Sequence, residues 1–378
     1  MILSALKYTR YAGEPREWSI EGNGGDYAYF GNINLFVGKN ASGKSRTLNV
    51  IREIADLVSG RIDLKYAISP SEKFELTFME GNDEYKYYLI FKDRIVNEEI
   101  LSLNDKVLLD RAKKILLNKE GQNIDFEAKD FQLVVSLCDM TDTPYFKHIV
   151  LWGESLKNYL FANQLEKNRL VKDYTQIDGD DHDIDDPDVL IYIFHKGRDM
   201  HGAEFVSEII ENMQALGYAI SGIDIREERC GYGIVIEEEG EYMVSQREMS
   251  QGMFRALALF IMLSYARLND LSLCLLVDDM GEGLDFDSSK KMMDIVTKKV
   301  QKSNIQFFMT TNDRQVMNQI SLRFWSVIDR QHNKSVFYDY TNSTDTFEDF
   351  KYTGLNNFDF LVSDFYKEGF GIINEDND

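Results

Sequence analysis

The sequence has few cysteines, and their spacing forms no known framework. Its 378 residues include three, Cys138, Cys230 and Cys274, which lie far apart and make no C-x-x-C motif. An odd number of widely spaced cysteines argues against a disulfide framework, and the missing motif argues against a zinc site. Both absences fit a protein of the reducing cytoplasm.

Long hydrophobic runs are also missing. The longest apolar run, residues 256–263, is far shorter than the roughly 20 residues that a helix needs to cross a bilayer. The N-terminal stretch MILSALKYTRY becomes charged too early for a signal peptide. We therefore expect a soluble, cytoplasmic protein that does not use a membrane.

Positive charge is scarce. Lysine and arginine total 42 against 64 aspartates and glutamates, which gives a formal net charge of -22. A surface this acidic repels the phosphates of nucleic acids and of anionic lipids. DNA remains a possible partner, but any contact with it requires a local basic patch.

Repeats, sustained heptads and common nuclease or protease motifs are absent. The five histidines are scattered, with no H-E-x-x-H motif and no paired histidines of the HNH type. Without three or four consecutive heptads, long coiled-coil arms are not expected. The chain therefore shows neither a metalloprotease centre nor an HNH nuclease centre.

The motif that is present is GKNASGKS, from Gly38 to Ser45. It follows the apolar segment INLFV and precedes apolar residues at helical spacing, so the sequence predicts a strand, a phosphate loop and a helix. In such loops backbone N–H groups face phosphate oxygens, the lysine bridges the outer phosphates and the serine hydroxyl ligates Mg²⁺. ATP and Mg²⁺ are the expected cofactors. The candidate nucleotide-binding residues of this segment are Gly38, Asn40, Ala41, Ser42, Gly43, Lys44, Ser45 and Arg46.

The residues after this helix predict an inserted lobe. Residues 73–101 alternate in polarity and break at short polar turns, which predicts an antiparallel meander. Residues 105–171 have a mixed, mostly helical pattern. Residues 173–188 hold eight aspartates and no lysine or arginine, which predicts a solvated flexible loop. A calcium site and a nuclease-like pair, Asp178 and Asp180, are weaker alternatives, because neither has its ligand register or flanking strands.

A second acidic motif follows the apolar segment LSLCLLVDD. A buried parallel strand that ends in a carboxylate would present Asp278 to a magnesium ion at the carboxyl edge of the sheet. The alternative is a core strand that runs into a charged turn. The position downstream of a phosphate loop favours the magnesium site.

The segment DDMGEGLD and the upstream MSQGMFRAL resemble the second acidic motif and the signature of the ABC and SMC class of ATPases. The resemblance implies an α/β fold: a P-loop ABC-type ATPase head with a mainly parallel core sheet, an antiparallel β side lobe and a helical insertion. It also implies that Ser250 and Gly252 contact nucleotide in a partner subunit, as does Asp285 after Leu284. Taken alone, the pattern of Ser250 and Gly252 is weak and favours an ordinary helix cap.

Two departures from that class bear on catalysis. Asp279 stands where the catalytic glutamate is usual, and its carboxylate is one methylene shorter, which predicts slow hydrolysis. Asn312 stands where a switch histidine is usual; it can hydrogen-bond a phosphate oxygen but cannot become cationic. Glu282 is a candidate compensating carboxylate. The candidate catalytic residues are Asp279, Lys44, Asn312 and Glu282, and the candidate metal ligands are Ser45 and Asp278.

In this class the signature of one subunit closes over the nucleotide of another, so the resemblance implies a homodimer or higher homo-oligomer. Within the class, the chain resembles the compact ATPases of bacterial anti-phage systems, namely the PARIS, Septu and OLD-type groups, on the segments EGLDFD, TTNDRQVMNQI and GLNNFDF. That branch implies control of a separate effector, a nuclease or a toxin.

Other functions remain open at this stage. A DNA-repair or recombination clamp would need its lysines to converge on one basic groove. A transporter motor subunit is a weaker alternative, and a switch that binds ATP without turnover is a fourth. The lysines that the clamp would need are Lys113, Lys114, Lys290 and Lys291.

The expected organisation is an ATPase core of residues 1–60 and 205–378 with an inserted lobe of residues 61–204. In the C-terminal tail, Phe358, Leu361, Val362 and Phe365 share one face of an expected helix, which either packs on the core or docks a partner. Near the N-terminus, either Tyr8 or Tyr11 stacks on adenine, or both belong to an exposed strand.

Overall fold

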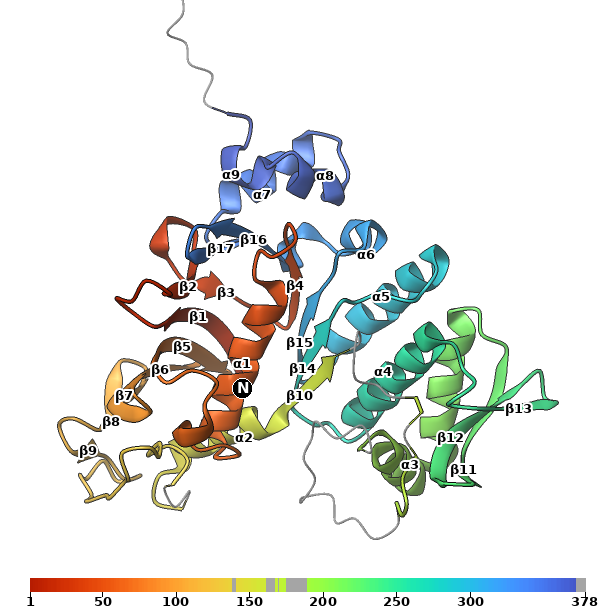
Figure 1. Ribbon diagram of the computed structural model, residues 1–378, viewed down its shortest axis with the longest axis horizontal. Helices are drawn as coiled ribbons and strands as arrows, with labels where there is room; N and C mark the ends of the chain where they lie inside the picture. The colour runs from red at the N-terminus through yellow and green to blue at the C-terminus, as the bar shows by residue number, and fades with distance from the viewer. Residues whose placement is uncertain (138–140, 161–166, 169, 175–188, 372–378) are drawn as a thin grey trace, which may run out of the picture. The chain divides into compact units, whose positions relative to one another are not determined.

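The structure is a computed structural model of the chain, and it describes residues 1–137, 141–160, 167–168, 170–174 and 189–371. The chain divides into two compact units. Unit 1 comprises Met1–Leu156 and Ile320–Asp378, and unit 2 comprises Lys157–Gln319. Figure 1 shows the helices and strands of both. Most of the aspartate run, residues 175–188, lies outside the described residues.

Unit 1 is built on one mixed sheet. Its strands lie in the order β4, β16, β17, β2, β1, β5, β6, β7, β8, β9, with β3 beside β1. The pairs β4/β16 and β17/β2 are parallel, and the pairs from β2/β1 to β8/β9 are antiparallel. The strands are β1 (Ile2–Arg10), β2 (Trp18–Gly22), β3 (Ala28–Tyr29), β4 (Ile33–Val37), β5 (Glu72–Glu80), β6 (Asp83–Lys92), β7 (Ile95–Leu103), β8 (Lys106–Asp110), β9 (Ile115–Leu116), β16 (Trp325–Gln331) and β17 (Lys334–Asp339).

The hairpins of the meander follow from local sequence. Strand β5 alternates between buried and partly exposed side chains, as the period of a half-buried strand requires. Asp93 and Arg94, between β6 and β7, both have positive φ, which is the backbone of a tight two-residue hairpin turn. The expected lobe is continuous with the sheet that carries the phosphate loop, because β5 pairs along the whole length of β1.

The described α-helices of unit 1 fall into two groups along the chain, two before Leu156 and three after strand β17. Helix α1 carries an apolar stripe that includes Leu48, Ile51 and Ile54, and all three are buried. Within the described part of residues 105–171, α2 is the helix, so the expectation of a mostly helical segment was wrong. Residues 106–116 instead continue the meander as β8 and β9. The helices are α1 (Lys44–Val58), α2 (Pro144–Ser155), α7 (Thr344–Asp349), α8 (Asn357–Val362) and α9 (Phe365–Glu368).

Unit 2 combines a parallel strand pair with helices and a small antiparallel sheet. Strands β14 and β15 are parallel, and the separate sheet has the order β11, β12, β13. Helix α3 is interrupted at Gly202, which has a positive φ. The elements are α3 (Val189–Ala215), β11 (Ile220–Glu228), β12 (Gly231–Glu238), β13 (Tyr242–Ser245), α4 (Gln251–Leu268), β14 (Leu273–Asp278), α5 (Phe286–Val300), β15 (Ile305–Thr310) and α6 (Arg314–Gln319); β10 (Leu156–Leu160) lies at the boundary of the units.

The boundaries of the two units differ from those of the expected ATPase core and inserted lobe. The meander, which was expected in the lobe, belongs with the N-terminal strands in unit 1. The sheet is mixed rather than mainly parallel, since β1, β2, β16 and β17 enter it as antiparallel hairpins. No described helix combines the length and the apolar composition needed to cross a bilayer.

Candidate functional site

The phosphate loop of unit 1 connects the buried strand β4 to helix α1. All five residues of β4 are buried. A Cβ on Gly38 would lie 2.5 Å from the Ile328 carbonyl oxygen, and a Cβ on Gly43 would lie 2.6 Å from the Ser335 hydroxyl oxygen. Gly43 also has a φ of 112°, which side chains other than glycine rarely adopt. The two glycines of the motif therefore allow the loop to pack against β16 and β17.

Lys44 crosses this loop. Its side chain is 8% exposed, and its Nζ donates hydrogen bonds to the Gly38 carbonyl at 2.8 Å and to the Lys39 carbonyl at 3.5 Å. Gly43, the N-cap of α1, provides no side-chain cap, so the positive end of the helix dipole faces the loop. The arrangement suits an anion such as a phosphate.

Ser335 and Trp18 form a chain of hydrogen bonds that ends at the phosphate loop. Ser335 donates from its hydroxyl to the Ser42 carbonyl at 2.8 Å and accepts from Trp18 Nε1 at 3.2 Å. Among the described residues, Ser42 Oγ is buried without a hydrogen-bond partner. A buried polar atom left in this position fits a loop that closes on a polar ligand. Sequence reasoning missed Ser335, because a lone serine in a late strand carries no motif.

The remaining loop residues are exposed, and the nearby charge is positive. Asn40, Ala41, Ser45 and Arg46 all face outward. The Arg46 guanidinium lies over the Trp18 ring, 4.3 Å from its centroid. Partial burial, and then repulsion from Arg10 and Arg330, lowers the pKa of Arg46. These cations raise the potential at the start of α1, which favours phosphate.

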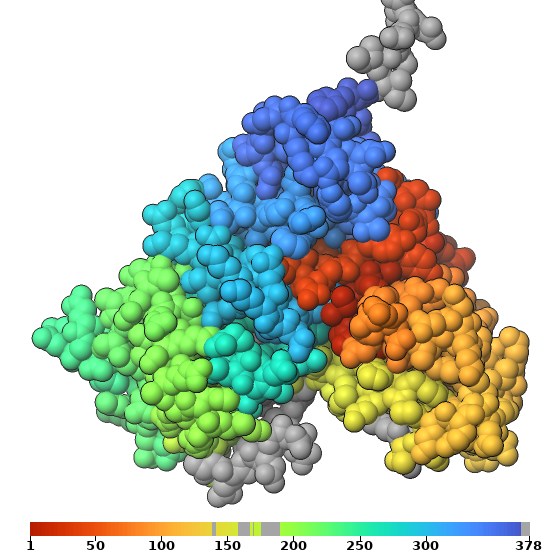
Figure 2. Space-filling view, turned by 180° about the vertical axis from the view of Figure 1, so that it is seen from behind, coloured from red at the N-terminus to blue at the C-terminus, as the bar shows by residue number. Residues whose placement is uncertain are grey.

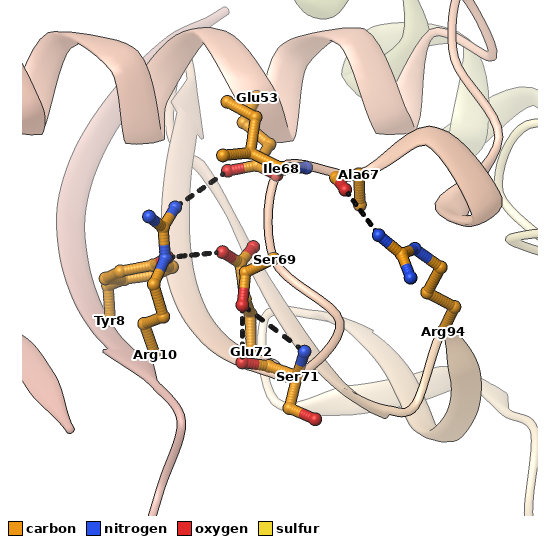
Figure 3. Close-up of polar contacts among 9 residues, drawn as sticks. All are labelled: Tyr8, Arg10, Glu53, Ala67, Ile68, Ser69, Ser71, Glu72 and Arg94. Carbon is orange, nitrogen blue, oxygen red and sulfur yellow. Dashed lines mark hydrogen bonds and ion pairs between the residues drawn. The ribbon is translucent and has the colours of Figure 1, made fainter. Parts of the chain in front are cut away.

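A buried polar cluster links helix α1 to strands β1 and β5 (Figure 3). Its members are Tyr8, Arg10, Glu53 and Glu72. Arg10 Nε donates to Glu72 Oε1 at 2.9 Å, and Arg10 Nη2 donates to Glu53 Oε2 at 3.3 Å. The Tyr8 hydroxyl donates to Glu72 Oε1 at 2.6 Å. Tyr8 is 1% exposed, so it neither stacks on adenine nor belongs to an exposed strand.

Two carboxylates share one guanidinium in this cluster. Burial, with repulsion from Glu53, raises the pKa of Glu72 to about 8. Burial also raises the pKa of Glu53, whose Oε1 accepts from the Ile68 N–H at 2.9 Å. Because burial disfavours the charged forms, the cluster favours holding a proton near neutral pH.

In unit 2, the acidic motif lies at the ends of β14 and β15. The Thr310 hydroxyl donates to the Asp278 carboxylate and accepts from the Asp279 N–H at 2.9 Å. Asn312 Nδ2 donates to Asp279 Oδ1 at 3.2 Å. The predicted residues Asp278, Asp279 and Asn312 therefore lie together, and Thr310 hydrogen-bonds the first two. Sequence reasoning missed Thr310, although its place at the end of the adjacent strand was a usable signal.

The segment MSQGMFRAL, which resembles the signature of the ABC and SMC class, leads into helix α4. Ser250 is its N-cap, and the hydroxyl accepts from the Met253 N–H at 3.1 Å. A Cβ on Gly252 would lie 2.1 Å from the Gly283 carbonyl oxygen. Glycine is therefore required where α4 meets the loop that follows the acidic motif.

That loop is fixed to α4 by Arg255. The Arg255 side chain is 3% exposed, and its Nη1 donates to the Glu282 carbonyl at 3.0 Å and to Glu282 Oε2 at 3.1 Å. The Glu282 carboxylate is thus engaged by Arg255, whereas that of Asp279 is engaged by Asn312.

The same loop leads to Asp285, the N-cap of α5. The Ser288 N–H donates to Asp285 Oδ1 at 3.0 Å, and the Ser288 hydroxyl donates to Oδ2 at 2.7 Å. These two hydrogen bonds lower the pKa of Asp285. Its side chain stays exposed, so it can carry a negative charge at the surface of unit 2.

No protein-family model matches the sequence, and a search of curated proteins finds no match. Solved structures do resemble it. A SmcHead bound to the C-winged helix domain of ScpA matches with a TM-score of 0.54 and 12% identity, over 89% of this chain and 97% of that chain. The fold is similar to that of an SMC head.

Two further SMC heads are among the matches. The SMC head domain from Thermotoga maritima has a TM-score of 0.46 and 14% identity, over 89% of this chain and 98% of that chain. An Smc head domain with an extended coiled coil, bound to the C-terminal domain of ScpA derived from Pyrococcus furiosus, has a TM-score of 0.49 and 13% identity, over 92% and 99%.

The SMC-head-like fold and the two motif clusters define what could hold ligands. In unit 1, Lys44, Gly43 and the start of α1 provide donors for phosphate. In unit 2, Asp278 provides a carboxylate at a strand end, a ligand type that Mg²⁺ accepts. Among the described residues, no group of three or more His, Cys, Asp or Glu side chains is placed to hold a metal. A magnesium ion here would thus rely on few protein ligands and on the phosphates themselves, as in phosphoryl-transfer sites.

Proposed function

We propose that this protein binds Mg-ATP and hydrolyses it slowly, as an ATPase of the ABC and SMC class. The observation that carries the proposal is the phosphate loop. Its two glycines pack where no side chain fits, and Lys44 Nζ donates to the Gly38 carbonyl across it at 2.8 Å. The likeness to an SMC head in fold supports the same conclusion.

The proposed roles follow from the donors and acceptors present. Lys44 and the loop N–H groups would hold phosphates. The exposed Ser45 of unit 1 and Asp278 of unit 2 are each proposed as metal ligands. When bound, Mg²⁺ would supply positive charge that offsets the charge of the phosphates. Asp279, held by Asn312 Nδ2, would orient and deprotonate the attacking water. A carboxylate held by a neighbouring amide is restricted to few orientations, which favours this task.

We further propose that the active form is a homodimer or higher homo-oligomer in which Ser250 and Asp285 complete the site of a partner subunit. The Ser250 hydroxyl uses one acceptor position for the Met253 N–H. A hydroxyl also has a donor hydrogen and a second acceptor position. In this structure Ser250 also hydrogen-bonds the Tyr218 hydroxyl, so donation to a phosphate oxygen would require the Ser250 hydroxyl to turn from Tyr218 to the nucleotide.

On the sequence resemblance alone, we propose that this ATPase controls a separate effector, a nuclease or a toxin, in bacterial anti-phage defence. The alternative DNA clamp depends on lysines that include Lys113, whose ammonium pairs with Asp110 at 2.7 Å. Salt-sensitive binding of duplex DNA by the isolated protein would favour the clamp. Loss of protection by Lys44→Ala in a phage-plating assay would favour defence.

The biochemical proposal is tested by light scattering and phosphate release. We would compare wild type, Lys44→Ala and Ser250→Arg, each with and without Mg-ATP. We expect ATP to increase the mass of the wild type, Lys44→Ala to lose binding, and Ser250→Arg to lose turnover. A monomeric protein whose Ser250→Arg variant hydrolyses ATP as fast as the wild type would contradict the shared site. A wild type that binds no Mg-ATP would contradict the whole proposal.

A further inference from the structure

The C-terminal helices of unit 1 form a small aromatic core of their own. Figure 2 shows these residues, in blue, as a compact group at the surface. Phe360 makes ring contacts with Phe347 and Phe350 at centroid distances of 4.7 and 4.9 Å. It also reaches Trp325 of β16 at 6.5 Å. This core fixes α7, α8 and α9 on the strand that supports the phosphate loop.

Asp364 lies in the turn between α8 and α9. Its φ of 55° and ψ of 23° are left-handed, a conformation that aspartate tolerates better than most residues. The turn divides the single helix expected over Phe358–Phe365 into two short helices. As a result Phe365 is buried whereas Val362 is 58% exposed, so the expected face was only partly right.

The Asp364 carboxylate contacts the phosphate loop directly. Lys39 Nζ donates to Asp364 Oδ1 and Oδ2, both at 3.2 Å. Lys39 is the second residue of the phosphate-loop motif, and its side chain is 67% exposed. Partial burial opposes ionisation of Asp364, but hydrogen bonds from Lys39 and Tyr366 outweigh it and lower the pKa of this carboxyl.

Tyr366 also links the Asp364 carboxylate to strand β16. Buried Tyr366 hydrogen-bonds Asp364, and its hydroxyl lies 3.5 Å from Asp329 Oδ1. Lys367 Nζ lies 2.8 Å from Asp329 Oδ2. Asp329 follows Ile328, the residue whose carbonyl Gly38 approaches. Asp364 is therefore tied to the same strand that shapes the loop.

Lys39 is well placed to serve a second anion. Its carbonyl accepts from Lys44 Nζ at 3.5 Å and from the Ser42 N–H at 3.1 Å, so its backbone lies beside the lysine that is proposed to hold the outer phosphates. Its long, exposed side chain can turn from Asp364 toward that position. A triphosphate carries more negative charge than one carboxylate and would compete for the ammonium.

We propose that Lys39 is a second phosphate-binding lysine and that Asp364 is its counter-ion when no nucleotide is bound. The α8–α9 turn then opposes nucleotide binding, and nucleotide releases the turn from the loop. This inference rests on the proposed function, because it requires Mg-ATP in the loop. Lys39 is a binding residue in this scheme, and Asp364 is a positioning residue that acts through it.

The test is a double-mutant cycle on the Mg-ATP affinity of the full chain, measured by titration calorimetry at low salt. Asp364→Asn suits it, because asparagine accepts the left-handed conformation and can still accept from Tyr366. Exposed ion pairs contribute up to about 1 kcal/mol, so we expect Asp364→Asn to tighten binding about three- to fivefold. We expect Lys39→Ala to weaken binding, and the gain from Asp364→Asn to shrink in the Lys39→Ala chain.

Three controls make the result decisive. Glu368→Gln removes an exposed carboxylate from the same segment and sets the effect of charge at a distance. Lys44→Ala identifies binding in the loop, and equal melting temperatures identify intact folding. If Asp364→Asn changes affinity no more than Glu368→Gln, or equally with and without Lys39, the inference is wrong. If the wild type binds no Mg-ATP at all, the proposed function fails and the inference fails with it.

Discussion

Asn312 donates a hydrogen bond from Nδ2 to Oδ1 of Asp279 at 3.2 Å. The amide follows β15 and the carboxylate follows β14, so a parallel strand pair brings them together. These are the two residues that the sequence resemblance aligns with the usual histidine and the usual glutamate of the ABC and SMC class. The two residues that differ from the pattern of that class, Asn312 and Asp279, are therefore in direct contact.

Asp279→Asn is expected to lower the rate of phosphate release by about 10²- to 10⁴-fold, the usual contribution of a general base. Mg-ATP binding should persist, because asparagine keeps the oxygen that accepts from Asn312. Single-turnover phosphate release and equilibrium ATP binding separate the two effects. An unchanged rate would remove Asp279 from the mechanism.

Glu282→Gln is expected to cost less activity than Asp279→Asn. The Glu282 carboxylate is 56% exposed and bound to Arg255, which limits its ability to compensate for the shorter Asp279. The same phosphate-release assay ranks the two variants. A larger loss in Glu282→Gln than in Asp279→Asn would show that Glu282 is the principal carboxylate.

Ser250→Gly and Ser250→Ala should separate capping from nucleotide contact. Glycine costs an N-cap only a few tenths of a kcal/mol, whereas alanine costs about 0.5–2 kcal/mol. We expect Ser250→Gly to melt close to wild type and yet to lose turnover, because the hydroxyl is gone. Thermal melting and phosphate release on the same samples give the answer. Wild-type turnover in Ser250→Gly would leave Ser250 as a helix cap only.

Gly252→Ala is expected to destabilise the protein by about 1–3 kcal/mol, because overpacking against a fixed backbone forces a shift. The new Cβ would meet the Gly283 carbonyl oxygen at 2.1 Å. Denaturant unfolding measures the loss. Gly31→Ala is the matched control, since no atom lies within 4 Å of its Cβ position, and equal stability of the two variants would contradict the packing argument.

Stability should fall as pH rises, because of the cluster in Figure 3. Burial and Glu53 raise the pKa of Glu72 from its ordinary value of 4.5 to about 8. Between these values the folded state keeps a proton that the unfolded state loses, so the free energy of unfolding decreases with pH. This contribution is complete below the lower value and is lost above the upper one.

Glu72→Gln should flatten that dependence, since the amide does not titrate. Urea unfolding at several pH values across the window, with Glu98→Gln as an exposed control on β7, provides the comparison. A wild type whose unfolding free energy rises with pH through the window would refute the assignment.

The sequence was informative where one segment determines its own structure. The glycines of the phosphate loop, the apolar strand before Asp278 and the N-cap at Ser250 all follow from local chemistry. Ser335 could not be singled out, because an isolated hydroxyl gains its role from a strand that is distant in sequence. Thr310 was overlooked, although it ends the strand that follows the acidic motif. The break at Asp364 was also hidden, since aspartate in a left-handed turn is one option among several for a polar residue.

Strand order limited the prediction of the fold in the same way. Alternating polarity predicted the meander, and the structure has β5, β6 and β7 there. Nothing in β16 or β17 indicates that these late strands lie between β4 and β2. Pairing between strands about three hundred residues apart leaves no local signature.

That strand order has a consequence for synthesis on the ribosome. The neighbours of β4 and β2 in the unit 1 sheet, β16 and β17, end at Asp339. Until that residue leaves the exit tunnel, the nascent chain carries two open strand edges beside its phosphate loop, and open edges invite pairing with other chains. A chain released early would thus contain the complete GKNASGKS motif without the strands that shape it, and it should depend on chaperones or aggregate.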